Sequence, residues 1–172
     1  MGGSSKTVLA IGGTGAQGVP VVKGAYIDSL WLVSLLILQE LAADGRYKVI
    51  ILTRSGQSDP AMELASLPKV AVMEGDAFDE PTLVKAFKGV DAAFVNTNGF
   101  AIGEKAEIYW GIRIYEIAYG AGVKHFVWGS LDYSSKLGNF DPSFHCGHLD
   151  GKGIVADFIH SQIGRASCRE RV

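Results

Sequence analysis

The stretch Gly12-Gly13-Thr14-Gly15-Ala16-Gln17-Gly18 decides the fold of this chain. It follows an apolar run at residues 7–11 and leads into a segment that can be helical. Glycines spaced three apart suit a sharp turn off a strand, close approach of the backbone to a pyrophosphate, and tight helix packing on a sheet. Amide groups at the start of that helix would receive a phosphate. The stretch therefore predicts a dinucleotide site, with a merely structural turn as the alternative.

Apolar runs recur along the chain with helical segments between them. Strands are predicted at residues 7–11, 48–53, 70–74, 92–96 and 124–128. Continuous apolar runs are typical of parallel strands that are covered on both faces. The alternation of strands and helices predicts an α/β fold, a doubly wound parallel sheet of the Rossmann type, with strand order 3-2-1-4-5. The ligand crevice is then expected at the carboxyl ends of the first and fourth strands.

Two helices are predicted with recognisable ends. The first spans residues 80–87, with Asp79 or Glu80 as its cap, Pro81 in its first turn and Gly89 beyond its end. The second spans residues 104–119 and ends at two glycines. Its predicted apolar stripe is formed by Ile108, Ile112 and Tyr115.

Composition narrows the function classes. The chain has 172 residues, of which 48% are hydrophobic, so it can form one domain with a real core. Lys and Arg number 16 against 18 acidic residues, and no basic block is visible, so direct nucleic-acid binding is not expected. Two cysteines make no disulfide framework, and no signal peptide or membrane span is recognised. The expected location is the cytoplasm or the nucleus.

Two segments do not fit a dinucleotide-binding domain over residues 6–162. Residues 24–39 place Arg54 farther from the glycines than the usual spacing of about 20 residues. This stretch is apolar on every face, and three interpretations remain open: an interaction hairpin, an extended buried helix, or a retained intron. Residues 163–172 look like a translated sequencing adapter, so we expect a non-native tail there.

Candidate cofactor contacts lie in the glycine turn, after three strands and near the end of the chain. They are Gly12, Thr14, Gly15, Ala16, Gln17, Gly18, Arg54, Asp76, Asn96 and Lys152. Arg54 follows the second strand, where an arginine accommodates the 2′-phosphate of NADP and an acid would bind the 2′-hydroxyl of NAD. NADP is therefore favoured over NAD. Solvated or turn-forming roles are the alternatives for Arg54, Asp76 and Asn96.

Lys152 and His148 are the candidate catalytic residues. In short-chain dehydrogenases a Tyr-x-x-x-Lys pair lies on one face of a helix, and the Lys holds the ribose and assists the Tyr as acid. Here His148 takes the position of the Tyr, so the usual acid is missing although a histidine can transfer protons. His145, Cys146 and His148 lack a second pair of ligands at zinc-finger spacing, so no metal is expected.

These motifs together resemble the NmrA-like family of atypical short-chain dehydrogenases. The matching segments are residues 12–18, 52–54, 75–76, 122–128 and 148–153, and the resemblance covers residues 6–162 apart from 24–39. It implies a Rossmann domain that binds NADP, or NAD in some members. The matched turn and Arg54 would hold the cofactor, and Lys152 would lie near the nicotinamide ribose.

The resemblance also implies a function. Several such proteins act as redox sensors or transcriptional co-regulators through partner proteins, and others are reductases. The second half of such proteins, with the last strands and a small substrate or partner domain, has no counterpart here. A sensor that binds NADP(H) is the first hypothesis, an NADPH-dependent reductase the second, and an inactive truncated fragment the third.

Overall fold

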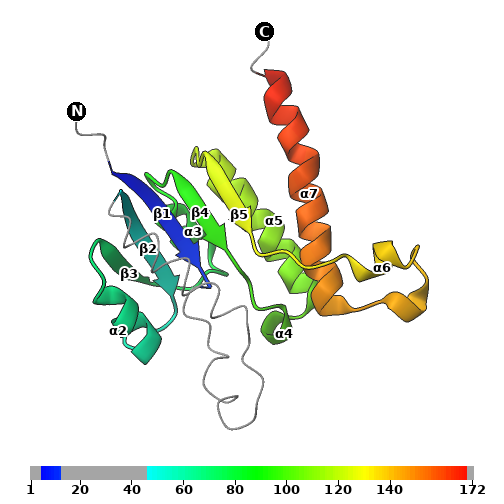
Figure 1. The fold of residues 1–172 in the computed structure, drawn as a ribbon, viewed down its shortest axis with the longest axis horizontal. Helices are drawn as coiled ribbons and strands as arrows, with labels where there is room; N and C mark the ends of the chain where they lie inside the picture. The colour runs from blue at the N-terminus through cyan, green and yellow to red at the C-terminus, as the bar shows by residue number, and fades with distance from the viewer. Residues whose placement is uncertain (1–4, 13–45, 170–172) are drawn as a thin grey trace. The chain divides into compact units, whose positions relative to one another are not determined.

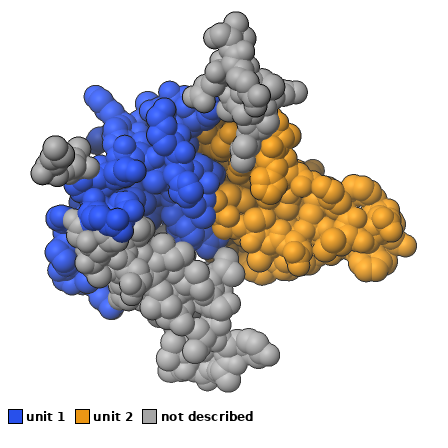
Figure 2. Space-filling view, turned by 45° about the horizontal axis from the view of Figure 1, so that its top comes forward, with its two compact units in different colours: residues 1–96, 117–127 blue, residues 97–116, 128–172 orange. Residues whose placement is uncertain are grey.

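A computed structural model describes residues 5–12 and 46–169 of the chain, with side chains described to residue 162 (Figure 1). The chain divides into two compact units, which are coloured separately in Figure 2. Unit 1 comprises residues 1–96 and 117–127, and unit 2 comprises residues 97–116 and 128–172.

A parallel sheet forms the centre of unit 1 (Figure 1). Its strands are β1 (Lys6–Ile11), β2 (Tyr47–Thr53), β3 (Val70–Glu74), β4 (Ala92–Val95) and β5 (His125–Trp128), whose last residue belongs to unit 2. The order is β3-β2-β1-β4-β5, which confirms the predicted topology. Leu9 of β1 pairs with Ile50 of β2 on one side and with Ala93 of β4 on the other.

Burial is greatest at the centre of the sheet. From Val8 to Ile11, β1 is no more than 5% exposed, as expected for a strand covered on both faces. The outer strands β3 and β5 differ from that expectation, because each of their residues is either half-buried or exposed. An edge strand has a neighbour on one side alone, so its residues lose less contact with solvent.

One helix of unit 1 begins with the signals seen in the sequence. In α3 (Glu80–Ala86) the Asp79 carboxylate accepts a hydrogen bond from the Thr82 amide at 3.0 Å, so Asp79 is the cap. Gly89 follows with a φ of +73°. The other helix, α2 (Asp59–Ala65), buries Leu64, which packs with core residues of β1 and β2.

Unit 2 is built mainly from helices. It contains α4 (Gly99–Ile102), the first part of α5 (Glu104–Gly120), α6 (Ser134–Leu137), the 3-10 turn η2 (Pro142–Phe144) and α7 (Gly147–Arg169). The backbone of α7 continues through residues 163–169 of the predicted non-native tail. Across the described residues, no helix combines the length and apolar character needed to cross a membrane.

The predicted apolar stripe of α5 is wrong in register. Ile108, Ile112 and Tyr115 are half-buried, whereas the fully buried positions are Glu107, Gly111, Ile114 and Ala118. These four positions share one helix face, since they are separated by four, three and four residues. A carboxylate and two small residues occupy three of them, so a hydrophobicity pattern does not identify this face.

Candidate functional site

The corner at the end of β1 is as tight as the glycine pattern predicts. Gly12 has a φ of +84°, a conformation that L side chains rarely adopt. A Cβ atom at this position would lie 1.9 Å from the Asn96 backbone oxygen. The backbone N–H of Asn96 donates a hydrogen bond to the Ile11 carbonyl at 3.0 Å, so the carboxyl ends of β1 and β4 are joined here. Residues 13–18, the remainder of the predicted turn, lie outside the described residues.

Arg54 is exposed directly after β2. The loop that carries it is fixed by hydrogen bonds, because the Gly56 amide donates to the Glu74 carboxylate at 3.1 Å and the Ser58 hydroxyl donates to the Ser55 carbonyl at 3.0 Å. The guanidinium therefore extends from an ordered loop at the carboxyl end of a strand. This is the position at which a 2′-phosphate is read in dinucleotide sites.

Asp76 follows the end of β3, and Asn96 follows the end of β4, which lies on the other side of β2 and β1 in the sheet. Asp76 is exposed, and its Oδ1 accepts a hydrogen bond from the Phe78 amide at 2.9 Å, so it forms the turn that was the alternative interpretation. Asn96 is half-buried at the Gly12 corner. Within unit 1 the structure thus brings Gly12 and Asn96 together and places Arg54 and Asp76 after adjacent strands.

Lys152 lies in a buried polar cluster of unit 2. Its Nζ donates to the Thr97 carbonyl at 2.8 Å and lies 3.3 Å from the Thr97 hydroxyl and 3.1 Å from Oε1 of Glu107. The Thr97 hydroxyl donates to the same Glu107 oxygen at 2.6 Å. Lys152 is 4% exposed and Glu107 is 0% exposed. The cluster joins α7, α5 and the segment after β4.

An aromatic ring contributes to the same cluster. The Lys152 ammonium lies 5.1 Å from the centre of the Trp128 ring, and the Trp128 indole N–H donates to the Lys152 carbonyl at 3.1 Å. Burial lowers the pKa of Lys152, and the Glu107 carboxylate opposes this effect. The counter-ion therefore favours the charged ammonium in surroundings that otherwise disfavour it.

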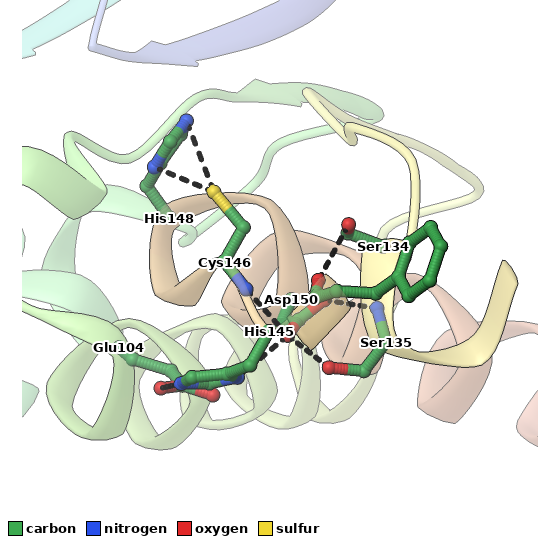
Figure 3. Close-up of polar contacts among 8 residues, drawn as sticks. Glu104, Ser134, Ser135, His145, Cys146, His148 and Asp150 are labelled. Carbon is green, nitrogen blue, oxygen red and sulfur yellow. Dashed lines mark hydrogen bonds and ion pairs between the residues drawn. The ribbon is translucent and has the colours of Figure 1, made fainter. Parts of the chain in front are cut away.

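His148 contacts a different set of groups. Its ring stacks on Phe100 of α4 with centroids 4.4 Å apart, and its Nδ1 lies 3.4 Å from the Cys146 sulfur. Figure 3 shows the imidazole beside this sulfur. His148 and Lys152 are four residues apart on α7, as predicted, but each is held by its own partners.

Asp150 organises the start of α7 (Figure 3). Its carboxylate accepts from the Ser135 amide at 2.9 Å, the Ser135 hydroxyl at 2.5 Å and the Cys146 amide at 3.1 Å. His145 Nδ1 lies 2.9 Å away, and His145 Nε2 lies 3.4 Å from Glu104. Burial raises the pKa of Asp150, but these hydrogen bonds outweigh it and lower the pKa to about 2.

The same residues form a group with metal-ligand spacing among the described residues. One ligand atom from each of Glu104, His145 and Asp150 lies within 4.8 Å of the others. This set differs from the His145, Cys146 and His148 set considered in the sequence. The Asp150 carboxylate already accepts from four protein groups, so hydrogen bonding explains its position.

Sequence reasoning missed several residues of these clusters, among them Glu107, Ser135 and Asp150. Glu107 is a charged residue in a helix otherwise rich in apolar residues, and this was the signal that the sequence offered. The burial of Lys152, which requires a counter-ion, was not predicted. Asp150 and Ser135 are brought together by a return of the chain through α6 and η2, which no local pattern records.

The parallel sheet, with its order β3-β2-β1-β4-β5, defines the class of α/β proteins with a doubly wound sheet of the Rossmann type. The chain belongs to the NmrA-like family, which matches it over residues 4–163.

Several curated relatives support this assignment. An NmrA-like family domain-containing protein of Dictyostelium discoideum is 33% identical over 155 residues, which are 90% of this chain and 45% of the relative. The NmrA-like oxidoreductase notA' of Aspergillus versicolor is 32% identical over 140 residues, which are 78% of this chain and 34% of that protein. The chain thus spans less than half the length of these relatives.

Solved structures share the fold. NmrA, a negative transcriptional regulator, has a TM-score of 0.71 at 23% identity and covers 93% of this chain, which matches 43% of the regulator. The same regulator in complex with NADP has a TM-score of 0.63 at 23% identity, over 89% of this chain and 42% of that chain. At these identities the comparison establishes the fold alone.

Proposed function

We propose that this chain provides the NADP(H)-binding part of a regulatory protein of the NmrA-like type. In this proposal, cofactor occupancy changes the affinity of the protein for a partner protein, as in a redox sensor or transcriptional co-regulator. A ligand shifts such an equilibrium only by its differential affinity for the two states, so NADP and NADPH must differ in their effect.

The observation that carries the proposal is the Gly12 corner. Gly12 has a left-handed backbone conformation, and the Asn96 backbone oxygen lies where a Cβ atom on Gly12 would be. The ends of β1 and β4 therefore lie close together, with no side chain from Gly12 between them. A backbone of this kind at the reversal point of a parallel sheet suits a pyrophosphate. The exposed Arg54 after β2 suits a 2′-phosphate. The residues present therefore fit NADP, and structures of a family regulator with NAD and with NADP support the same cofactor class.

The state of Lys152 favours binding over catalysis. An ammonium has three N–H donors, and three acceptors from Thr97 and Glu107 lie within 3.3 Å of Nζ. A lysine with all three donors engaged is suited to providing a fixed positive charge and to stabilising the fold. It is less suited to assisting a catalytic acid at each turnover. When bound, NADPH would supply a hydride, but this chain has a histidine where the usual acid is a tyrosine.

Calorimetric titration of the full chain with NADP, NADPH and NAD tests the proposal. Binding of NADP and NADPH, with weaker binding of NAD, is expected. NADPH oxidation measured over a panel of aldehydes, ketones and quinones is expected to stay at the buffer rate. A chain that is folded by circular dichroism but binds neither NADP nor NADPH would end the proposal.

A second candidate is an NADPH-dependent reductase, which the names of several relatives favour. Relatives 29–34% identical, from Aspergillus species and other organisms, are named NmrA-like domain-containing oxidoreductases. In this candidate Lys152 acts with His148, whose ring is oriented by Phe100 and Cys146. Steady oxidation of NADPH by a carbonyl substrate, abolished in Lys152→Ala and in His148→Phe, would favour this function over the sensor.

A further inference from the structure

We propose that Glu107 is the positioning residue for Lys152, which it holds against the chain segment after β4 so that a fixed positive charge contributes to dinucleotide binding. This inference rests on the proposed function, because the cofactor is what the fixed charge would serve. The positioning of Lys152 concerns unit 2 alone, to which Thr97, Glu107 and Lys152 all belong.

The geometry of the cluster is that of a closed hydrogen-bonded ring. Lys152 Nζ reaches Oε1 of Glu107 at 3.1 Å and the Thr97 carbonyl at 2.8 Å, while the Thr97 hydroxyl donates to Oε1 at 2.6 Å. Each of the three residues contacts the other two. The direction of the ammonium is therefore set jointly by α5, which carries Glu107, and by residue 97.

The second carboxylate oxygen indicates that the charge of Glu107, and not only its hydrogen bond from Thr97, holds it here. Oε2 is buried and has no hydrogen-bond partner among the described residues. A buried carboxylate that leaves one oxygen unpaired is costly, and an ammonium 3.1 Å from its other oxygen offsets that cost. A residue needed solely for packing would have no reason to carry this charge.

Two glycines make the room that the carboxylate occupies. A Cβ atom on Gly99 would lie 2.0 Å from Oε2, and one on Gly151 would lie 3.2 Å from it. Gly99 begins α4, and Gly151 directly precedes Lys152 on α7. The backbone of two elements is thus shaped around a glutamate at this position.

The groups around Lys152 indicate that Glu107 is the charged group that raises the pKa of its ammonium. Glu107 faces the ammonium from α5, and Thr97 and Trp128 face it with groups that do not titrate. On α7 itself, Asp150 is directed to Ser135 and His145. Removal of the Glu107 charge would leave burial unopposed by that counter-ion, so the pKa of Lys152 would fall further.

The first test measures Lys152 directly and needs no cofactor. In the full chain labelled with ¹⁵N-lysine, the Nζ signal that disappears in Lys152→Met is followed by NMR as a function of pH. Glu107→Gln keeps the shape of the side chain and is expected to lower the pKa of Lys152 by about one unit or more. Glu116→Gln, at an exposed glutamate of the same helix that pairs with Arg113, is the control and is expected to change nothing.

A second variant keeps the test decisive if Glu107→Gln does not fold. Thr97→Val removes the hydroxyl that bridges Glu107 and Lys152 while leaving the carboxylate charge. The protons of the Lys152 ammonium are then expected to exchange with water at least several-fold faster than in the wild type. Unchanged titration in Glu107→Gln, or unchanged exchange in Thr97→Val, would overturn the positioning role.

The second test connects the position of Lys152 to the cofactor. NADP affinity is measured by calorimetry from pH 6 to 10. As the pH rises, the affinity of Glu107→Gln is expected to begin to fall at a lower pH than that of the wild type and of Glu116→Gln. Superimposable pH profiles would overturn the inference. Failure of the wild type to bind NADP would instead reject the proposed function, and the NMR titration would still decide whether Glu107 positions Lys152.

Discussion

At the scale of single residues, Gly12 carries the strictest requirement among the glycines that the structure describes in unit 1. Gly12→Ala is expected to destabilise the protein for two reasons, a strained left-handed backbone and a Cβ atom 1.9 Å from the Asn96 oxygen. The strain alone costs about 1–2 kcal/mol for an L residue, and the steric overlap adds to it. Urea unfolding of the wild type and the variant measures the loss.

Gly89 offers a matched control for this prediction. It has a φ of +73°, but a Cβ atom there would have nothing within 4 Å. Gly89→Ala should therefore lose about the strain alone, roughly 1–2 kcal/mol, and keep NADP affinity. Equal losses of stability at both positions would mean that the crowding at Asn96 has no energetic consequence.

Arg54 is the residue that should separate the two cofactors. Arg54→Ala is expected to weaken NADP binding by roughly 1.5–3 kcal/mol, the value of a hydrogen bond to a charged group, and to leave NAD binding almost unchanged. The reason is that the 2′-phosphate is the group that NAD lacks. Calorimetry with both cofactors measures the difference, and equal losses would remove Arg54 from the 2′-phosphate site.

At the scale of elements, the start of α7 depends on one carboxylate. Asp150→Asn is expected to lower the free energy of unfolding by about 1–3 kcal/mol near neutral pH, because the amide is a poorer acceptor for Ser135 and the Cys146 amide. Asp157→Asn is the control on the same helix, at an exposed residue that pairs with Lys136. It should cost less than about 1 kcal/mol.

The same carboxylate predicts a pH dependence with a definite sign. Burial raises the pKa of Asp150, and the stronger effect of its hydrogen bonds lowers the pKa from 3.8 to about 2 in the folded chain. Its contribution to stability is therefore complete above about pH 4 and is lost as the pH falls toward 2. The stability difference between wild type and Asp150→Asn should shrink over this range, and a constant difference would contradict the assignment.

The ends of α3 could be predicted from the sequence, whereas the buried face of α5 could not. Caps and glycines at the ends of α3 are local signals, so Gly89 was placed correctly and the cap was one of the two predicted residues, Asp79. The buried face of α5 was not placed correctly, because it includes Glu107, whose ion-pair partner Lys152 lies 45 positions away in the sequence. When a charged residue occupies a buried position of a helix, the apolar residues of that helix no longer mark its buried face by their spacing.

At the scale of the whole molecule, the strand order was predictable because parallel strands joined by helical crossovers allow few topologies. The positions of Arg54, Asp76 and Asn96 after β2, β3 and β4 follow from that order. The surroundings of Lys152 and His148 do not, since Thr97, Glu107 and Phe100 come from other segments of the chain. The glycine turn beyond Gly12 and the 24–39 stretch lie outside the described residues, so their roles stay predictions.

Cofactor binding should be visible in the stability of the whole chain. A ligand that binds the folded state alone, at 100 times its dissociation constant, adds about 2.7 kcal/mol to the free energy of unfolding. For a chain of this size that corresponds to a rise in Tm of roughly 5–10 °C. Differential scanning fluorimetry with increasing NADP measures this rise, which should grow with the logarithm of the NADP concentration above saturation.

Arg54→Ala makes this measurement specific to the cofactor site. At the same NADP concentration, an affinity loss of roughly 1.5–3 kcal/mol leaves about half or less of the stabilisation, because stabilisation depends on concentration relative to the dissociation constant. The Tm rise with NAD should persist in this variant, since NAD has no 2′-phosphate for Arg54 to bind. A Tm that does not respond to NADP in the folded wild type would mean that the corner at Gly12 does not receive a dinucleotide in this chain, whatever its backbone geometry.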